Sequence, residues 1–204
     1  MKRIAIFIDG TWNRPDAEHP TNVLRLSRCV KHYDRKMGQQ QFVIYSPGVG
    51  CGRGNNALAR KMDRTFGGAL GWGLLDIIED TYRNLVFAYE PGDEIFVFGF
   101  SRGAFAARSL VGLIRSCGIP PRSHLARIPE AMARYVSRLP DTHPDDPSSF
   151  EFRESYAPLT ATSASEYKWR RDRGDDQAIR LLIPYLGVWD TVGALGVPAI
   201  VPGA

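Results

Sequence analysis

Ser101 stands in the pattern Gly-Phe-Ser-Arg-Gly, residues 99–103, directly after the apolar run from Ile95 to Phe98. Small, helix-compatible residues follow the pattern. This order of strand, sharp turn and helix is that of a nucleophile elbow, in which a serine stands at the tip of a strained turn. The two flanking glycines lack a Cβ, so a strand and a helix can approach closely around the serine. The pattern predicts a nucleophilic hydroxyl at a helix N-terminus, although an ordinary glycine-rich turn has the same composition.

A serine hydroxyl becomes a good nucleophile only when a base removes its proton, and an acid must orient that base. In one large group of serine hydrolases the three residues follow one another as Ser, Asp or Glu, and His. Asp190 follows an apolar stretch and fits the second place. All four histidines precede it: His19, His32, His124 and His143. The sequence therefore supplies a candidate nucleophile and acid, while His124 and His143 could reach over Ser101 only in the wrong chain order.

Acyl transfer passes through a negatively charged oxygen, which backbone N–H groups can bind. One donor would be the N–H of Arg102, and the second an N–H from the loop after the first strand, hence Gly10 or Thr11. Asp9 begins that loop, where ligand-contacting residues of parallel sheets lie; the alternative is a turn carboxylate that binds its own backbone. The three cysteines are too few and too dispersed for a metal cluster or a disulfide framework. We therefore expect chemistry without a metal or a cofactor.

Apolar runs that alternate with helical patterns must position these groups. The runs predict strands at residues 4–8, 42–45, 94–98 and 179–189, with Pro184 as a point where the last could break. Helices are predicted from Thr21 or Asn22 until Gly38 stops the helix, from 74 to 89, and from Ser101 to Gly118. The alternation predicts an α/β fold with a mostly parallel sheet and helices on both faces. In such folds, ligands bind at the carboxyl ends of the strands.

Two segments interrupt this alternation. Residues 46–56 form a glycine-rich loop without the Gly-Lys-Ser/Thr of a phosphate-binding loop, and we expect its backbone to pass close to a substrate or to Ser101. Residues 121–176 are polar and rich in proline. We expect an insertion there, with a helix over 128–139 and a loop over 141–149, that either caps the sheet or is a passive surface excursion.

Composition limits the function classes. The net charge is only +4 and the charges are scattered, which disfavours nucleic acid as a partner. No apolar run has the length of a transmembrane segment, and the N-terminal run stops at Asp9, too early for a signal peptide. Dispersed cysteines suit a reducing compartment. We expect a cytoplasmic location in the producing cell, or export without a signal peptide.

Five motifs occur in a fixed order: Phe-Ile-Asp-Gly-Thr-Trp-Asn at 7–13, Tyr-Ser-Pro-Gly-Val-Gly at 45–50, Gly-Trp-Gly-Leu at 71–74, the segment 89–110 around Ser101, and Leu-Gly-Val-Trp-Asp-Thr-Val-Gly-Ala-Leu-Gly at 186–196. With them the chain resembles, over nearly all of residues 3–198, the family of α/β-hydrolase domains that includes the type VI secretion phospholipase effectors. The resemblance implies an α/β-hydrolase fold, hydrolysis of lipids or other esters, and Ser101 and Asp190 as nucleophile and acid. The histidine of that family lies beyond the fifth motif, where this sequence has ended.

The sequence thus predicts one α/β-hydrolase-like domain over residues 1–204, truncated at its C-terminus, that hydrolyses acyl esters through an acyl-Ser101 intermediate. A phospholipid is the favoured substrate. Its strands would be the third to sixth of the full sheet, with one edge left unpaired. The alternative is a non-catalytic fragment or a partner-binding remnant, because the triad histidine is absent. Expected partners are a lipid or other ester and, beyond it, a secretion system or the missing C-terminal segment.

Overall fold

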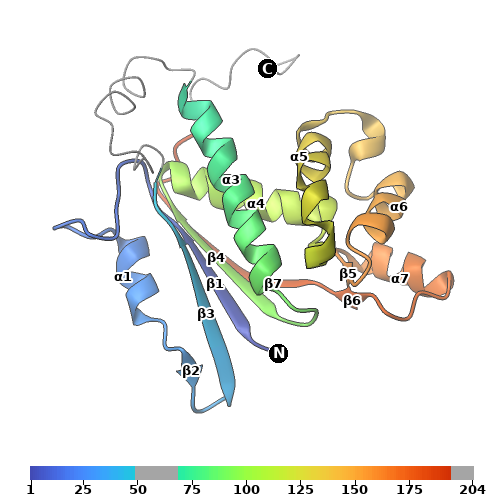
Figure 1. The fold of residues 1–204 in the computed structure, drawn as a ribbon, viewed down its shortest axis with the longest axis horizontal. Helices are drawn as coiled ribbons and strands as arrows, with labels where there is room; N and C mark the ends of the chain where they lie inside the picture. Colours follow the sequence, from blue (N-terminus) through green and yellow to red (C-terminus); the bar gives the residue numbers. More distant parts are fainter. Residues whose placement is uncertain (49–68, 194–204) are drawn as a thin grey trace.

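The computed structural model describes residues 1–48 and 69–193, which form a layered α/β structure around one sheet (Figure 1). The glycine-rich loop lies outside the described residues from residue 49 onward, as does the end of the fifth motif. The sheet has the order β2-β3-β1-β4-β7. Its strands are β1 (Arg3–Ile8), β2 (Tyr33–Asp34), β3 (Gln39–Ser46), β4 (Glu94–Phe100) and β7 (Leu182–Trp189). All pairs except the antiparallel β2–β3 are parallel, which confirms the predicted mostly parallel sheet.

β1 is the centre of the sheet, between β3 and β4. Its side chains from Ile4 to Ile8 are buried on both faces, which explains why the strand is one continuous apolar run. Ile4, Ile6 and Ile8 pack into a cluster with α3 (Ala69–Ala88) and α4 (Arg102–Cys117). Phe7 faces the other way and packs with Val23 of α1 (Asn22–Cys29). Helices therefore cover both faces, as predicted.

The first helix is shorter than predicted. Thr21 caps α1, because its side chain accepts a hydrogen bond from the Leu24 N–H at 3.1 Å. The helix ends at Cys29, well before Gly38. Instead of continuing the helix, β2 pairs with the start of β3, and Gly38 takes the positive φ of 62° in the turn between them. The prediction that Gly38 ends the helix was wrong, because this glycine lies in the turn of the β2–β3 hairpin.

The predicted strand at 179–189 divides into β6 (Ile179–Arg180) and β7. β6 pairs with β5 (Thr160–Ala161) in a separate two-stranded sheet. Pro184 does not break β7. Glu94 pairs with Leu182 but Phe96 pairs with Tyr185, so the register shifts by one residue at the proline. A proline has no N–H to give to a ladder and is tolerated at such an irregularity of an edge strand.

The segment after α4 is more regular than predicted. It contains the 3-10 helices η1 (Arg122–Arg127) and η2 (Pro140–Thr142) and the helices α5 (Ile128–Val136), α6 (Pro147–Tyr156) and α7 (Ala164–Asp172). The expected loop over 141–149 contains the start of α6, where Asp146 accepts the Ser148 N–H and Pro147 takes the first helical position. Ser163 caps α7 in the same way.

This segment packs on the C-terminal half of α4. A Cβ on Gly112 would lie 2.9 Å from the Tyr135 hydroxyl, and the Cys117 thiol donates to the Ala131 carbonyl oxygen. Ser101 is at the opposite end of α4, which has 16 residues and is therefore about 24 Å long. The contacts at Gly112 and Cys117 give no support to a cap over Ser101.

A buried ionic cluster of Arg153, Glu166 and Arg170 holds these helices together, and all three side chains are 0% exposed. Glu166 accepts from Arg153 Nε at 2.8 Å and from Arg170 Nη2 at 2.9 Å. Arg153 also donates to the Ser116 carbonyl oxygen near the end of α4. The polar composition of the segment therefore reflects, in part, polar groups that are paired inside it.

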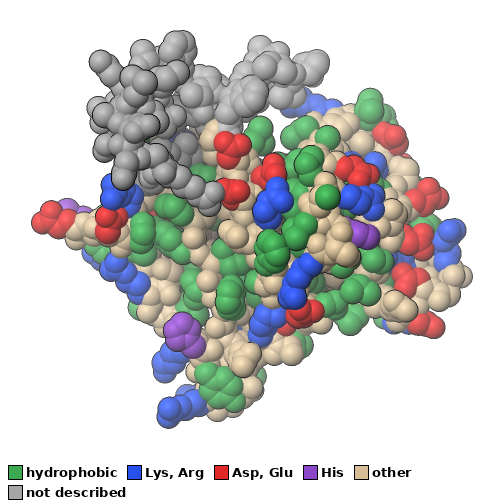
Figure 2. Space-filling view, viewed as in Figure 1, with side chains coloured by type: hydrophobic (Ala, Val, Ile, Leu, Met, Phe, Trp, Pro, Cys, Tyr) green, Lys and Arg blue, Asp and Glu red, His purple; other side chains and the backbone are tan. Residues whose placement is uncertain are grey.

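On the face drawn in Figure 2, basic and acidic side chains are interspersed with apolar ones. Within the described ranges, no helix combines the length and the apolar character that crossing a membrane requires.

Candidate active site

Ser101 lies between β4 and α4 with φ 55° and ψ −121°, outside the regions that L-residues ordinarily adopt. The flanking glycines make the turn feasible. A Cβ on Gly99 would lie 2.4 Å from the Gly103 carbonyl oxygen, and one on Gly103 would lie 2.3 Å from the Ile8 carbonyl oxygen. The strand, the helix and the neighbouring β1 thus meet at the serine with no room for larger residues.

Asp190 directly follows β7, the strand next to β4, and also has a positive φ, 45°. The Ser101 N–H donates to the Trp189 carbonyl oxygen at 3.0 Å, and the Val192 N–H donates to the Ser101 carbonyl oxygen at 3.3 Å. These bonds hold the backbone on both sides of Asp190 against the serine. The Asp190 side chain itself is exposed. The structure therefore brings together the two residues that the sequence proposed as nucleophile and acid.

Asp9 begins the loop after β1 and is only 1% exposed. Its carboxylate accepts a hydrogen bond from the Gly10 N–H at 2.8 Å, as the turn-carboxylate alternative predicts. It also accepts hydrogen bonds from the hydroxyl groups of Thr21 and Tyr45, each at 2.7 Å. The sequence did not predict these two partners, since both lie far along the chain from Asp9. The Gly10 N–H is thus already engaged.

The loop after β1 lies against the first turn of α4. A Cβ on Gly103 would be 2.4 Å from the Asp9 carbonyl oxygen, and one on Gly10 would be 2.8 Å from the Phe100 ring. The Thr11 hydroxyl is buried and has no hydrogen-bond partner within the described ranges. Thr11 and Arg102 are therefore on the two segments that flank Ser101. The N-terminus of α4 adds its positive dipole end at the same place.

None of the four histidines, which all lie within the described residues, has a hydrogen bond to Ser101 in the structure. His124 follows the far end of α4, and its Nδ1 lies 2.9 Å from the Tyr156 carbonyl oxygen. His143 is also at that end, because the neighbouring Asp145 pairs with Arg115 of α4 at 2.5 Å. His19 and His32 are exposed in segments on either side of α1. Within 1–48 and 69–193, no group of three or more His, Cys, Asp or Glu side chains could hold a metal ion.

Comparison with known proteins gives one uncharacterized relative and one family. The protein YEL023C of Saccharomyces cerevisiae is 28% identical over 204 residues, which is 96% of this chain and 27% of that protein. The chain thus spans about a quarter (27%) of the length of this curated relative. No solved structure matches the chain significantly. Residues 2–202 match the model of the family described as "T6SS, Phospholipase effector Tle1-like, catalytic domain". The chain belongs to this family of Tle1-like catalytic domains of type VI secretion phospholipase effectors.

Proposed function

We propose that this domain is a serine hydrolase that cleaves the acyl esters of phospholipids, with Ser101 as the nucleophile. The observation that carries the proposal is the backbone of Ser101, held at φ 55° at the start of α4 with Asp190 beside it. A conformation of this kind is unfavourable, and it exposes a serine hydroxyl at the tip of a turn. Family membership supports the lipid substrate. Delivery through a type VI secretion apparatus is part of the same proposal.

In the first step, Ser101 Oγ attacks the ester carbonyl carbon while a base takes its proton. The negative oxygen that forms is bound by the N–H of Arg102 and the N–H of Thr11. Thr11 is preferred to Gly10 because the Gly10 N–H already donates to Asp9. The C–O bond to the alcohol then breaks, the proton passes to the leaving alkoxide, and the acyl group remains on Ser101. Water attacks the acyl-serine by the same route and releases the fatty acid.

Asp190 would orient the base, which in this chemistry is a histidine. The four histidines of the sequence lie elsewhere, as described above. Removal of the base lowers turnover by about 10⁶-fold in a serine protease, so these 204 residues by themselves should turn over very slowly. This is the observation that favours the second candidate function, a non-catalytic module that binds a partner.

A fluorophosphonate probe tests the proposal, because it forms a covalent bond only with an activated serine. We expect Ser101→Ala to abolish labelling and Ser123→Ala, an exposed serine in η1, to leave it unchanged. With imidazole present, fatty-acid release from phosphatidylcholine vesicles should follow the same pattern. A chain that unfolds cooperatively, yet is not labelled even with imidazole added as an external base, would favour the non-catalytic module. Imidazole-dependent cleavage of a simple aryl ester without release of fatty acid from any phospholipid would overturn the substrate class.

A further inference from the structure

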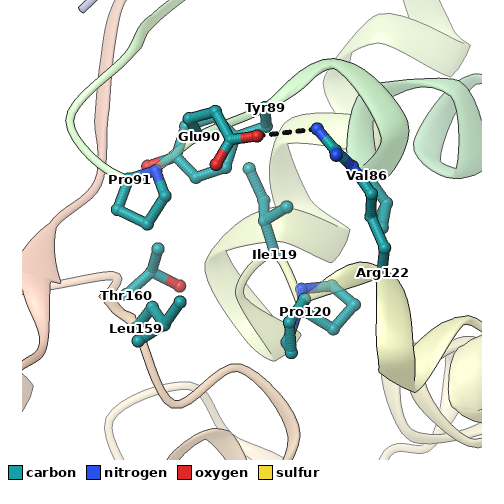
Figure 3. Close-up of a pocket in the computed structure, with 10 residues that line it drawn as sticks. Val86, Tyr89, Glu90, Pro91, Ile119, Pro120, Arg122, Leu159 and Thr160 are labelled. Atoms are coloured by element: carbon teal, nitrogen blue, oxygen red, sulfur yellow. Dashed lines mark hydrogen bonds and ion pairs between the residues drawn. The ribbon is translucent and has the colours of Figure 1, made fainter.

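A pocket of about 220 Å³ lies where the ends of α3 and α4 meet β5 (Figure 3). It is formed by residues that follow α3, residues that follow α4 and the segment before α7. Ser101 is at the other end of α4, about 24 Å away along the 16-residue helix. The pocket is therefore separate from the candidate active site, and its function does not depend on that of Ser101.

Two buried hydroxyl groups belong to this pocket. Thr160 is 1% exposed, and its Oγ1 has no hydrogen-bond partner in the described part of the chain. In Figure 3 this oxygen is turned toward the side of Ile119 and Pro120. Tyr89 is 7% exposed, and the Gly92 backbone is a hydrogen-bonding neighbour of its hydroxyl. A buried hydroxyl without a partner is unfavourable, so the Thr160 hydroxyl points to a ligand that pairs with it.

Much of the rest of the pocket wall is apolar. Val86, Ile119 and Leu159 form its walls together with the rings of Pro91 and Pro120. Proline fixes its own backbone φ, so these parts of the wall hold their shape without a ligand. A pocket that is already formed loses little conformational entropy on binding.

The charges at the pocket cancel each other. Glu90 and Arg122 form an ion pair at 2.6 Å, and both side chains are more than half exposed, at 61% and 55%. Burial raises the pKa of Tyr89 to about 12, so its hydroxyl is neutral near pH 7. An ionic ligand would meet no unpaired charge among the residues that line the pocket.

We propose that this pocket binds a small neutral amphiphile, an apolar body with one hydroxyl group that pairs with Thr160. Its size follows from the volume: a cavity of about 150 Å³ accommodates benzene, so this pocket suits roughly nine non-hydrogen atoms. Alkylphenols and short alcohols belong to this class. The apolar walls take the carbon body, and the hydroxyl supplies the partner that Thr160 lacks.

A titration of the 204-residue chain with p-cresol tests the proposal, followed by the amide NMR shifts of Ile119 and Leu159. The comparison ligand is p-xylene, which has a methyl group in place of the hydroxyl. Thr160→Val removes the hydroxyl and keeps the shape of the side chain. We expect this variant to bind p-cresol at least fivefold more weakly and p-xylene as well as the parent does. Its thermal midpoint should be unchanged or higher, because the lost hydroxyl had no partner.

Thr81→Val is the matched control, since Thr81 is also 1% exposed with an unpartnered hydroxyl but does not line this pocket. It should leave both affinities unchanged. The absence of saturable shifts with p-cresol would overturn the proposal and mean that the pocket holds water only. Equal weakening of p-cresol by Thr81→Val and Thr160→Val would also overturn it, because the effect would then not be local.

Discussion

Ser101 depends on glycine backbones that pack against it from three directions. A Cβ on Gly103 would lie 2.3 Å from the Ile8 carbonyl oxygen and 2.4 Å from that of Asp9, and backbone atoms cannot move aside as a flexible side chain can. Gly103→Ala should therefore destabilise the domain by about 1–3 kcal/mol and abolish labelling of Ser101. Urea unfolding measures the first effect. Gly193→Ala, where nothing in the described part of the chain lies within 4 Å of the new Cβ, is the control and should change neither quantity.

All four histidines of these 204 residues precede Asp190, and this gives a second prediction at the residue scale. If Ser101 and Asp190 are a nucleophile and an acid without their histidine, free imidazole should act as the base. We expect it to raise the rate of fluorophosphonate labelling by about tenfold, less than the roughly 10²–10⁴ of a positioned base. Asp190→Asn should reduce this gain, whereas Asp176→Asn, which is 83% exposed in a distant segment, should not. A rate that is independent of imidazole would contradict the assignment.

Local patterns sufficed to predict the turn at Ser101, the close packing at its two glycines and one of the two alternatives for Asp9, because each depends on residues next to it in the chain. The partners of Asp9 could not be predicted in this way. The Tyr45 hydroxyl reaches Asp9 across 36 residues, through the pairing of β1 with β3. Tyr45 and Thr21 donate to one carboxylate oxygen of Asp9, and the other oxygen accepts the Gly10 N–H. The Gly10 N–H is therefore not available to bind an oxyanion.

At the scale of elements, the sheet was largely predictable and so was α5, which confirms the helix predicted over 128–139, whereas α6 and α7 were not predicted. β1 and β4 are apolar runs, and burial is the main force that forms such strands. α6 and α7 instead bury the charged side chains of Arg153, Glu166 and Arg170. Their sequences therefore lack the regular spacing of apolar residues by which a helix is recognised. Their capping residues Asp146 and Ser163 were the available local signal.

The cluster around Glu166 predicts a large effect of one substitution. Glu166→Gln would leave Arg153 buried without a countercharge and Arg170 with only Asp175, at 3.3 Å. Removing one partner of a buried ion pair destabilises a protein by about 3–5 kcal/mol. Glu151→Gln, an exposed change on the same helix as Arg153, should be nearly neutral. Unfolding in urea compares the two. A difference below about 1 kcal/mol, the size expected for an exposed pair, would contradict the assigned role of the cluster.

At the scale of the whole molecule, α4 connects two chemically different ends. Its N-terminus meets Ser101, Asp190 and the loop after β1. Its C-terminal half packs against helices of residues 121–176 (Figure 1), and the residues that follow it line the pocket beside Thr160. The C-terminal end is rich in buried protonated groups. Burial raises the pKa of the Cys117 thiol to about 11, and also raises the pKa of Tyr82 and Tyr156.

These buried groups predict how stability depends on pH. The unfolded chain loses the Cys117 proton near the ordinary pKa of 9.0, whereas the folded chain keeps it until about 11. Between these values the folded state binds more protons, so the free energy of unfolding falls as pH rises, by up to about 1.4 kcal/mol per pH unit. Cys117→Ala removes this contribution, so its stability should decline less steeply from pH 9 to 11 than that of the parent. Urea unfolding at several pH values measures both slopes, and equal slopes would mean that the thiol titrates as it does in the unfolded chain.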